Sequence, residues 1–240
     1  MRDLNKYRPR PLIIRYLSGY FTLFMLSLAS RVKVYGRQFI PDRGPYIIAA
    51  NHFSVLDPIF IIYATQRPIN FLMASDQVVG NDMFWAPWIY GFIPTNRSKL
   101  APSTIKSSLQ VLRKNEILGI FPEATSLATE LRPAKEGAAY LSLATNVPIL
   151  PVSVTGHNHL WENLFRGVRQ TVTVRIGRAF GPFEQEITGK SRQQLLEKIG
   201  LEIMCRIGAL LPEEQRGFVK NHDVVRRFRE ENNSHTGYKF

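Results

Sequence analysis

Short apolar runs alternate with segments of helical hydrophobic spacing from residue 31 onward. The runs typical of strands cover residues 31–38, 46–50, 69–74, 91–94, 117–121, 148–154 and 171–176. The segments typical of helices cover residues 58–65, 81–90, 103–114, 135–145 and 191–211. Strands separated by helices at this rhythm predict an α/β layered domain with a central, mostly parallel or mixed sheet flanked by helices.

The segment Tyr16–Ser30 contains no charged residue and lies between Arg15 and Arg31. A helix of this length is about 22 Å long, which is short of the roughly 20 residues needed to cross a bilayer. Flanking arginines can extend toward the interface, and four basic residues precede the segment (Arg2, Lys6, Arg8 and Arg10). We expect a helix that lies in, or partly enters, an anionic membrane surface. A cleaved signal peptide ending near Ala29 and an ordinary core helix remain alternatives.

Length and composition bound the organisation of the chain. Its 240 residues are 45% hydrophobic, enough for one substantial domain with appendages. We expect a basic and apolar membrane-associating segment at 1–30, one main domain at 31–212 and a charged, partly ordered tail at 213–240. The net charge of +12 favours an anionic partner: nucleic acid, an anionic membrane surface or a phosphorylated small molecule. Cys205 is the single cysteine, which excludes an internal disulfide and a cysteine-rich metal site.

The stretch Asn51–Asp57 carries the first candidate for chemistry. The predicted strand 46–50 leads into Asn51 and His52, and Asp57-Pro58 is typical of a helix start with aspartate at the N-cap. Residues five apart on one helix point about 140° away from each other, but a loop lets the Asp57 carboxylate turn back onto His52. An imidazole held by a carboxylate is an oriented general base. The alternative is that Asp57 only caps the helix.

Three further residues lie where strands end or helices begin. Arg97 follows the strand at 91–94, and Glu123 follows the strand at 117–121, at the rim where active-site groups of α/β folds collect. Lys135 precedes a helix rich in small residues, whose N-terminus suits an anion such as phosphate. The alternatives are a solvated arginine, a turn-capping glutamate and tight helix–sheet packing.

Several other motifs are absent or incomplete. The chain has no G-x-S-x-G and no G-x-G-x-x-G, and the Gly189-Lys190-Ser191 sequence lacks the earlier glycine of a phosphate-binding loop. His157 and His159 have no further ligand at a suitable spacing, so we expect no metal site there. We see no repeat and no recognisable nucleic-acid motif.

Four ordered stretches together resemble the motifs of the glycerolipid acyltransferase family. They are Asn51-His52 with Asp57, Gly91–Arg97, Phe121-Pro-Glu-Ala-Thr-Ser126 and Val147-Pro-Ile-Leu-Pro151, and the resemblance covers about residues 31–180. It implies a glycerol-3-phosphate acyltransferase-like fold. It also implies transfer of a fatty acyl group from acyl-CoA or acyl carrier protein to a lysophospholipid, with 1-acylglycerol 3-phosphate, which gives phosphatidic acid, as the first acceptor to consider. No cofactor, metal or nucleic acid is implied.

The resemblance assigns a role to each matching position. His52 is the implied general base, and Asp57 orients and charge-stabilises it. The implied substrate-binding residues are Arg97, Glu123, Thr125, Lys135 and Asn51, of which Arg97 is associated with the acceptor phosphate. The implied location is monotopic or peripheral on the cytoplasmic face of the inner membrane.

The third motif departs from the family pattern, which reads Phe-Pro-Glu-Gly-Thr-Arg. Ala124 stands in place of glycine and Ser126 in place of arginine. The missing guanidinium removes a bidentate phosphate donor, which Arg132 or Lys135 can replace. A different lyso-lipid or alcohol acceptor is therefore an alternative, and a non-catalytic basic protein that binds membrane or nucleic acid is a remote one.

Overall fold

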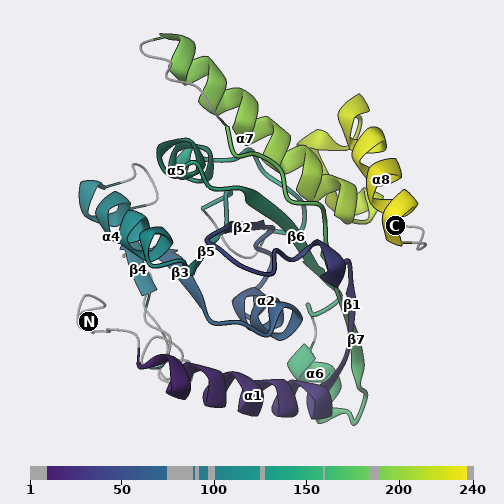
Figure 1. Ribbon diagram of the computed structural model, residues 1–240. Coiled ribbons are helices and arrows are strands. Elements are labelled where there is room, and N and C mark those ends of the chain that lie inside the picture. Colours follow the sequence, from purple (N-terminus) through teal and green to yellow (C-terminus); the bar gives the residue numbers. More distant parts are fainter. Residues whose placement is uncertain are drawn as a thin grey trace.

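Seven strands form one sheet within the part of the chain that this computed structural model describes, namely residues 10–74, 89, 92–96, 101–124, 128–158, 160–183 and 190–236. Their order is β1-β7-β6-β2-β5-β3-β4 (Figure 1). The bounds are β1 Ser30–Tyr35, β2 Ile47–Ala50, β3 Ile69–Ala74, β4 Phe92–Thr95, β5 Ile117–Ile120, β6 Ile149–Thr155 and β7 Gln170–Ile176. All neighbours pair in parallel except β6 and β7. The predicted mixed, mostly parallel sheet is confirmed.

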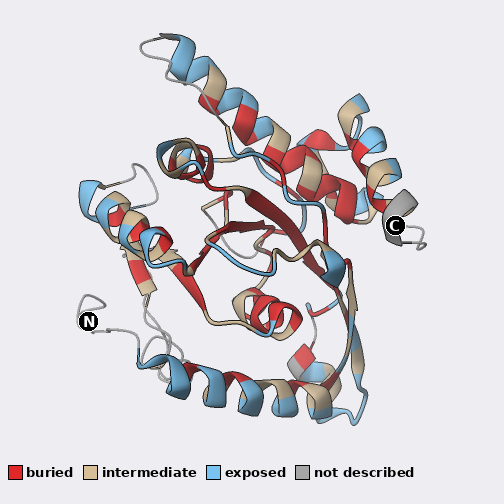
Figure 2. Cartoon of the chain, in the orientation of Figure 1, coloured by how far each residue is buried: buried red, intermediate tan, exposed pale blue. Residues whose placement is uncertain are grey.

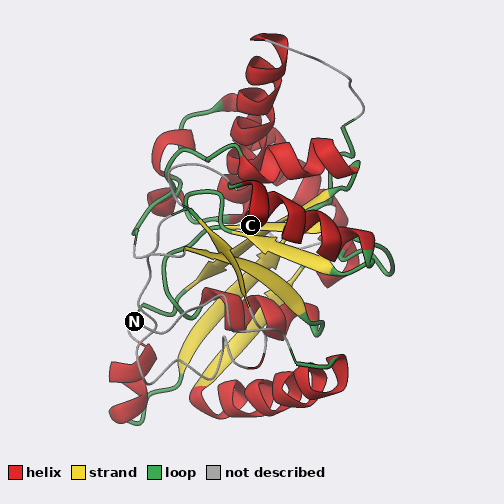
Figure 3. Cartoon of the chain, turned by 90° about the vertical axis from the view of Figure 1, so that its left-hand side faces the viewer, coloured by secondary structure: helices red, strands yellow, loops and turns green. Residues whose placement is uncertain are grey.

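Helices cover both faces of this sheet (Figures 1 and 3). Helices α4 (Pro102–Arg113), α5 (Gly137–Thr145) and α7 (Lys190–Leu210) lie on one face, and α2 (Asp57–Thr65) lies on the other, with α1 (Leu12–Ala29) outside it. The central strands β2, β5 and β6 are buried along their whole length, as the continuous apolar runs predict for a sheet covered on both sides. The core therefore lies between the two helix layers and holds the strand ends fixed.

The sequence pattern located most of these elements but missed two. The predicted helix at 81–90 lies outside the described residues apart from Ile89. Helix α6 (Leu160–Phe165) was not expected. In the charged segment from residue 213, which we expected to be partly ordered, two 3-10 turns (Glu213–Gln215 and Gly217–Val219) and helix α8 (Asp223–Thr236) follow α7. Val225 and Phe228 of α8 are buried.

Helix α1 meets the domain through one narrow side. Arg15 was expected to flank the apolar segment at the interface, but it lies inside the helix and is 3% exposed. Its guanidinium donates hydrogen bonds to the Ile69 carbonyl oxygen and to Asn70 Oδ1, and it lies 3.7 Å from the Glu116 carboxylate. These polar partners at the start of β3 and β5 account for the difference, because they satisfy a buried arginine that lipid would not.

The opposite side of α1 is exposed (Figure 2), and large apolar residues make up much of it. It presents large side chains from successive turns: Leu12, Ile13, Leu17, Tyr20, Phe21, Phe24 and Leu28. By length and composition, α1 is a helix that can cross a membrane, and only 11% of it is buried. We refer to these seven residues as the apolar face of α1.

The sheet order determines which loops meet at the site. Strands β6, β2 and β5 are adjacent and parallel, so their carboxyl ends share one edge. The residues that follow these strands are His157, His52 and Glu123 respectively. Ser30, at the end of α1, pairs with Gln170 at the start of β7, which runs antiparallel to β6, so α1 ends at the same edge.

Candidate active site

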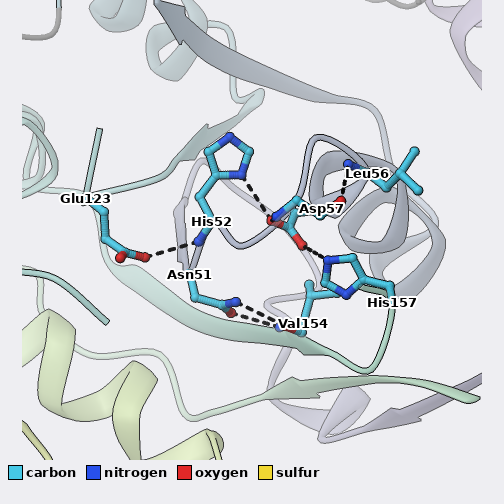
Figure 4. Close-up of polar contacts among 8 residues, drawn as sticks. Asn51, His52, Leu56, Asp57, Glu123, Val154 and His157 are labelled. Atoms are coloured by element: carbon cyan, nitrogen blue, oxygen red, sulfur yellow. Dashed lines mark hydrogen bonds and ion pairs between the residues drawn. The ribbon is translucent and has the colours of Figure 1, made fainter. Parts of the chain in front are cut away.

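His52 and Asp57 face each other across the loop between β2 and α2. The His52 Nδ1 atom lies 3.0 Å from Asp57 Oδ2 (Figure 4). The side chain of His52 is 19% exposed, whereas that of Asp57 is fully buried. The His52 ring stacks on Phe121, with ring centroids 4.0 Å apart and planes inclined by 16°. With Nδ1 held by the carboxylate, Nε2 is the ring atom that remains for an external partner.

The Asp57 carboxylate does not cap its helix as the sequence predicted. It is the first residue of α2, and no side-chain hydrogen bond caps that helix. Its Oδ2 instead accepts a hydrogen bond from the backbone N–H of Ser54 at 2.8 Å. The donors that surround the carboxylate on the loop side account for the difference.

Asp57 is held in its ionised form by its neighbours. Burial alone raises the pKa of this carboxyl, but hydrogen bonds from His157 and His52 outweigh burial and lower the pKa overall. A buried, ionised carboxylate in contact with an imidazole orients the ring and stabilises the imidazolium that forms when the ring takes a proton.

Glu123 follows β5 and faces the same loop from the other side (Figure 4). It is 4% exposed, and its Oε1 accepts a hydrogen bond from the backbone N–H of His52 at 3.1 Å. Its Oε2 accepts one from the backbone N–H of Arg132 at 3.0 Å. Burial raises the pKa of Glu123 to about 7, against the lowering effect of these two hydrogen bonds. Glu123 therefore joins two loops of the site, and its charge is set by pH in the neutral range.

Asn51 is fully buried beside this pair. Its Nδ2 donates to the Val154 carbonyl oxygen at 3.0 Å, and its Oδ1 accepts from the Val154 N–H at 2.9 Å. Both polar atoms of the side chain thus extend the β2–β6 pairing by one step. Its role in substrate binding stays a prediction.

Lys135 lies next to Glu123 in space. Its backbone N–H donates to the Pro122 carbonyl oxygen at 2.8 Å, and its side chain is exposed, as is that of Arg132. The structure therefore brings together His52, Asp57 and Glu123, and it places the backbone of Lys135 against Pro122, the residue before Glu123. Arg97, Thr125 and Ser126 lie outside the described residues.

Ala124 adopts a left-handed backbone conformation, with φ at 53°. Its N–H donates to the Phe121 carbonyl oxygen at 3.1 Å, which closes the turn after β5. Glycine is the residue that takes this conformation without steric cost. The turn accounts for the glycine at this position in the motif that the stretch resembles.

His157 is the site residue that the sequence analysis missed. It was considered only as a metal ligand with His159, yet its Nε2 lies 2.8 Å from Asp57 Oδ1. Among the described residues, no group of three or more histidine, cysteine, aspartate or glutamate side chains can hold a metal ion. This contact depends on β6 lying next to β2 in the sheet, so no local pattern of residues could have indicated it.

Several known proteins are similar in sequence to this chain. A family model described as Acyltransferase matches residues 31–155. The 1-acyl-sn-glycerol-3-phosphate acyltransferase of Bacillus subtilis (strain 168) is 28% identical over 139 residues, which cover 55% of this chain and 66% of the relative. The enzyme of the same name from Streptococcus pneumoniae (strain ATCC BAA-255 / R6) is 29% identical over 144 residues, which cover 59% of this chain and 53% of the relative. These matches span between about half and two thirds of each relative.

A solved structure shares the fold. The crystal structure of the 1-acyl-sn-glycerophosphate acyltransferase from Thermotoga maritima superposes with a TM-score of 0.56 at 21% sequence identity. The match covers 80% of this chain and 78% of that one.

Proposed function

Because this chain belongs to the acyltransferase family, we propose that it transfers a fatty acyl group from acyl-CoA or acyl carrier protein to the hydroxyl of a lysophospholipid. The first acceptor is 1-acylglycerol 3-phosphate, the substrate class in the names of its relatives. The observation that carries the proposal is the His52–Asp57 contact of 3.0 Å at the edge of the sheet.

His52 is the general base in this proposal. Its Nε2 takes the proton of the acceptor hydroxyl while Asp57 stabilises the imidazolium. The acceptor oxygen then forms a bond to the thioester carbonyl carbon, and the C–S bond breaks. The departing thiolate takes the proton from His52, which restores the neutral ring. This sequence needs no acyl-enzyme intermediate.

The apolar face of α1 provides the membrane contact. The helix is held to the domain by Arg15 at one end and continues directly into β1 at the other, so it lies along the domain rather than away from it. A helix with one docked side and one exposed apolar side is suited to lie in the plane of a membrane surface. Acyl-CoA and acyl carrier protein are cytoplasmic donors, which favours the cytoplasmic face of the inner membrane.

A second acceptor class remains because of the third motif. Ser126 replaces the arginine that a phosphate-binding motif would supply there. The same chemistry on a lyso-lipid without that phosphate, or on another alcohol, is the alternative function. One assay with a panel of acceptors separates these alternatives from 1-acylglycerol 3-phosphate.

The test is thiol release from acyl-CoA by the purified protein in the presence of an acceptor panel. With 1-acylglycerol 3-phosphate, His52→Ala should lower the acceptor-dependent rate by roughly 10³-fold, the range for loss of a general base. His222→Ala, on a partly exposed histidine before α8, is the matched control and should leave the rate unchanged. A rate for His52→Ala within twofold of the control would contradict the mechanism. Salt-sensitive DNA binding without any thiol release would contradict the function.

A further inference from the structure

The position of the His157 side chain is fixed by the backbone turn that precedes it and by its packing. It follows β6 and Gly156, whose φ is 85° and whose missing side chain would lie 2.5 Å from the Thr171 carbonyl oxygen. The turn at Gly156 therefore needs glycine. His157 is 2% exposed, and its ring lies against Phe60 of α2, with centroids 5.6 Å apart. The side chain is thus fixed between β6 and α2.

The Asp57 carboxylate lies between two imidazole rings (Figure 4). Oδ1 is 2.8 Å from His157 Nε2, and Oδ2 is 3.0 Å from His52 Nδ1. His52 is the ring open to an external partner, whereas His157 has a fully buried side chain. The two rings therefore cannot have the same task.

The second nitrogen of His157 indicates which proton the ring carries. Among the described residues, its buried Nδ1 atom has no polar neighbour within hydrogen-bond distance, whereas Nε2 lies 2.8 Å from Asp57 Oδ1, a short contact that departs from the direction of a linear hydrogen bond. A proton on Nδ1 would leave a buried N–H without an acceptor, and it would set the Nε2 lone pair against a carboxylate oxygen 2.8 Å away. The neutral ring with its proton on Nε2 avoids both costs.

We propose that His157 is a positioning residue: it donates its Nε2–H to Asp57 Oδ1, and so keeps the carboxylate ionised with Oδ2 turned to His52. The expected effect of His157 on turnover rests on the proposed acyl transfer. The hydrogen bond from His157 to Asp57 does not depend on that proposed function. A carboxylate that loses one donor can rotate about its side chain and binds a proton more readily. The His52–Asp57 pair then takes up a proton at higher pH, whichever of the two residues holds it.

Other titratable groups face the same loop. Glu123, after β5, accepts from the His52 backbone, and Arg132 lies beside Glu123. Because burial raises the pKa of Glu123 to about 7, the titration of Glu123 itself can change the pH profile, and its contribution must be separated. Glu123→Gln removes that titration and serves as a second background for each His157 variant.

Two substitutions at His157 separate its hydrogen bond from its volume. In His157→Gln the side-chain amide nitrogen reaches the place of Nε2 and still donates, while His157→Leu fills similar space without a donor. With 1-acylglycerol 3-phosphate and acyl-CoA, we expect His157→Leu to lower kcat by about 10- to 100-fold, with KM for both substrates within threefold. His157→Gln should retain at least a third of the wild-type kcat.

The pH dependence of kcat/KM distinguishes a positioning role of His157 from a purely structural one, because loss of packing alone would not shift it. In His157→Leu, the acid limb of kcat/KM should move to higher pH by about one unit. In His157→Gln it should stay in place, and both results should hold in the Glu123→Gln background. An unshifted limb in His157→Leu, or equal kcat for the two variants, would overturn the proposal.

Nitrogen NMR on histidine-labelled wild-type protein keeps the proposal testable if His157→Leu does not fold. The signals of His157 are those that disappear from the spectrum of His157→Gln. In the wild-type protein they should show a ring that carries its proton on Nε2 across neutral pH. A ring that carries its proton on Nδ1 would overturn the proposal. This measurement needs no turnover. Absent thiol release with the Nε2–H form present would therefore contradict the proposed function and leave the hydrogen bond standing.

Discussion

The backbone N–H of His52 donates a hydrogen bond to Glu123 Oε1 over 3.1 Å, while Oε2 of the same carboxyl group accepts from Arg132. Glu123 thus ties the loop that carries the proposed base to the loop that carries two exposed cations, Arg132 and Lys135. Because burial raises the pKa of Glu123 to about 7, the carboxyl group that joins these two loops changes charge near neutral pH.

Folding stability should fall as pH rises through the neutral range because of Glu123. The folded protein keeps the Glu123 proton up to about pH 7, whereas the unfolded chain releases it near the ordinary carboxyl value of 4.5. Between these values the folded state binds more protons, so the free energy of unfolding declines with pH, by at most about 3 kcal/mol. Urea unfolding between about pH 5 and pH 8 measures this decline.

Glu123→Gln should remove most of that decline, since the amide does not titrate. Glu130→Gln, on an exposed residue of the neighbouring loop, is the control and should keep the wild-type profile. Parallel profiles for wild type and Glu123→Gln would show that another group causes the pH dependence.

Ala124→Gly should stabilise the protein. An alanine at φ 53° carries a steric cost that glycine avoids, so the gain is about 1 kcal/mol after allowance for the more flexible unfolded chain. The free energy of unfolding in urea measures it. Ala101→Gly, at φ −71°, is the control and should be destabilising or neutral. If both glycine variants lose stability alike, Ala124 is not strained.

The apolar face of α1 should control binding to membranes. Replacing both Phe21 and Phe24, which are 64% and 58% exposed, with glutamate should weaken partition onto anionic vesicles by at least about tenfold. Flotation with phosphatidylglycerol vesicles measures the bound fraction. Leu201→Glu, on an exposed leucine of α7, should leave binding unchanged. Equal binding by the double variant would place the membrane contact elsewhere.

The sequence predicted the parts of the fold that depend on local pattern. The continuous apolar runs at β2, β5 and β6 and the Asp57-Pro58 helix start are visible in the residues alone, and the His52–Asp57 contact followed from the loop between them. These features involve residues close in the chain, so spacing and residue type determine them.

The features that the sequence did not predict depend on which strands are neighbours. His157 contacts Asp57 only because β6 adjoins β2, and Arg15 is buried only because α1 lies against the start of β3. Neither contact leaves a local signal. A single histidine after a strand, or a single arginine beside an apolar segment, has no defined partner until the order of the strands in the sheet is known.

Arg132 and Lys135 should determine the preference for an acceptor that carries a phosphate. Both side chains are exposed, and their backbone N–H groups hold the loop to Glu123 and Pro122, so the double variant Arg132→Gln, Lys135→Gln keeps the loop contacts while it removes two positive charges. A phosphate paired with these cations would lose charge-assisted hydrogen bonds. We expect KM for 1-acylglycerol 3-phosphate to rise about tenfold, and KM for the phosphate-free 1-acylglycerol to change less than about twofold.

Lys114→Gln, on an exposed lysine after α4, controls for net charge. If both acceptors weaken equally, these cations act on the acyl donor instead, and the acceptor headgroup must be recognised by other residues.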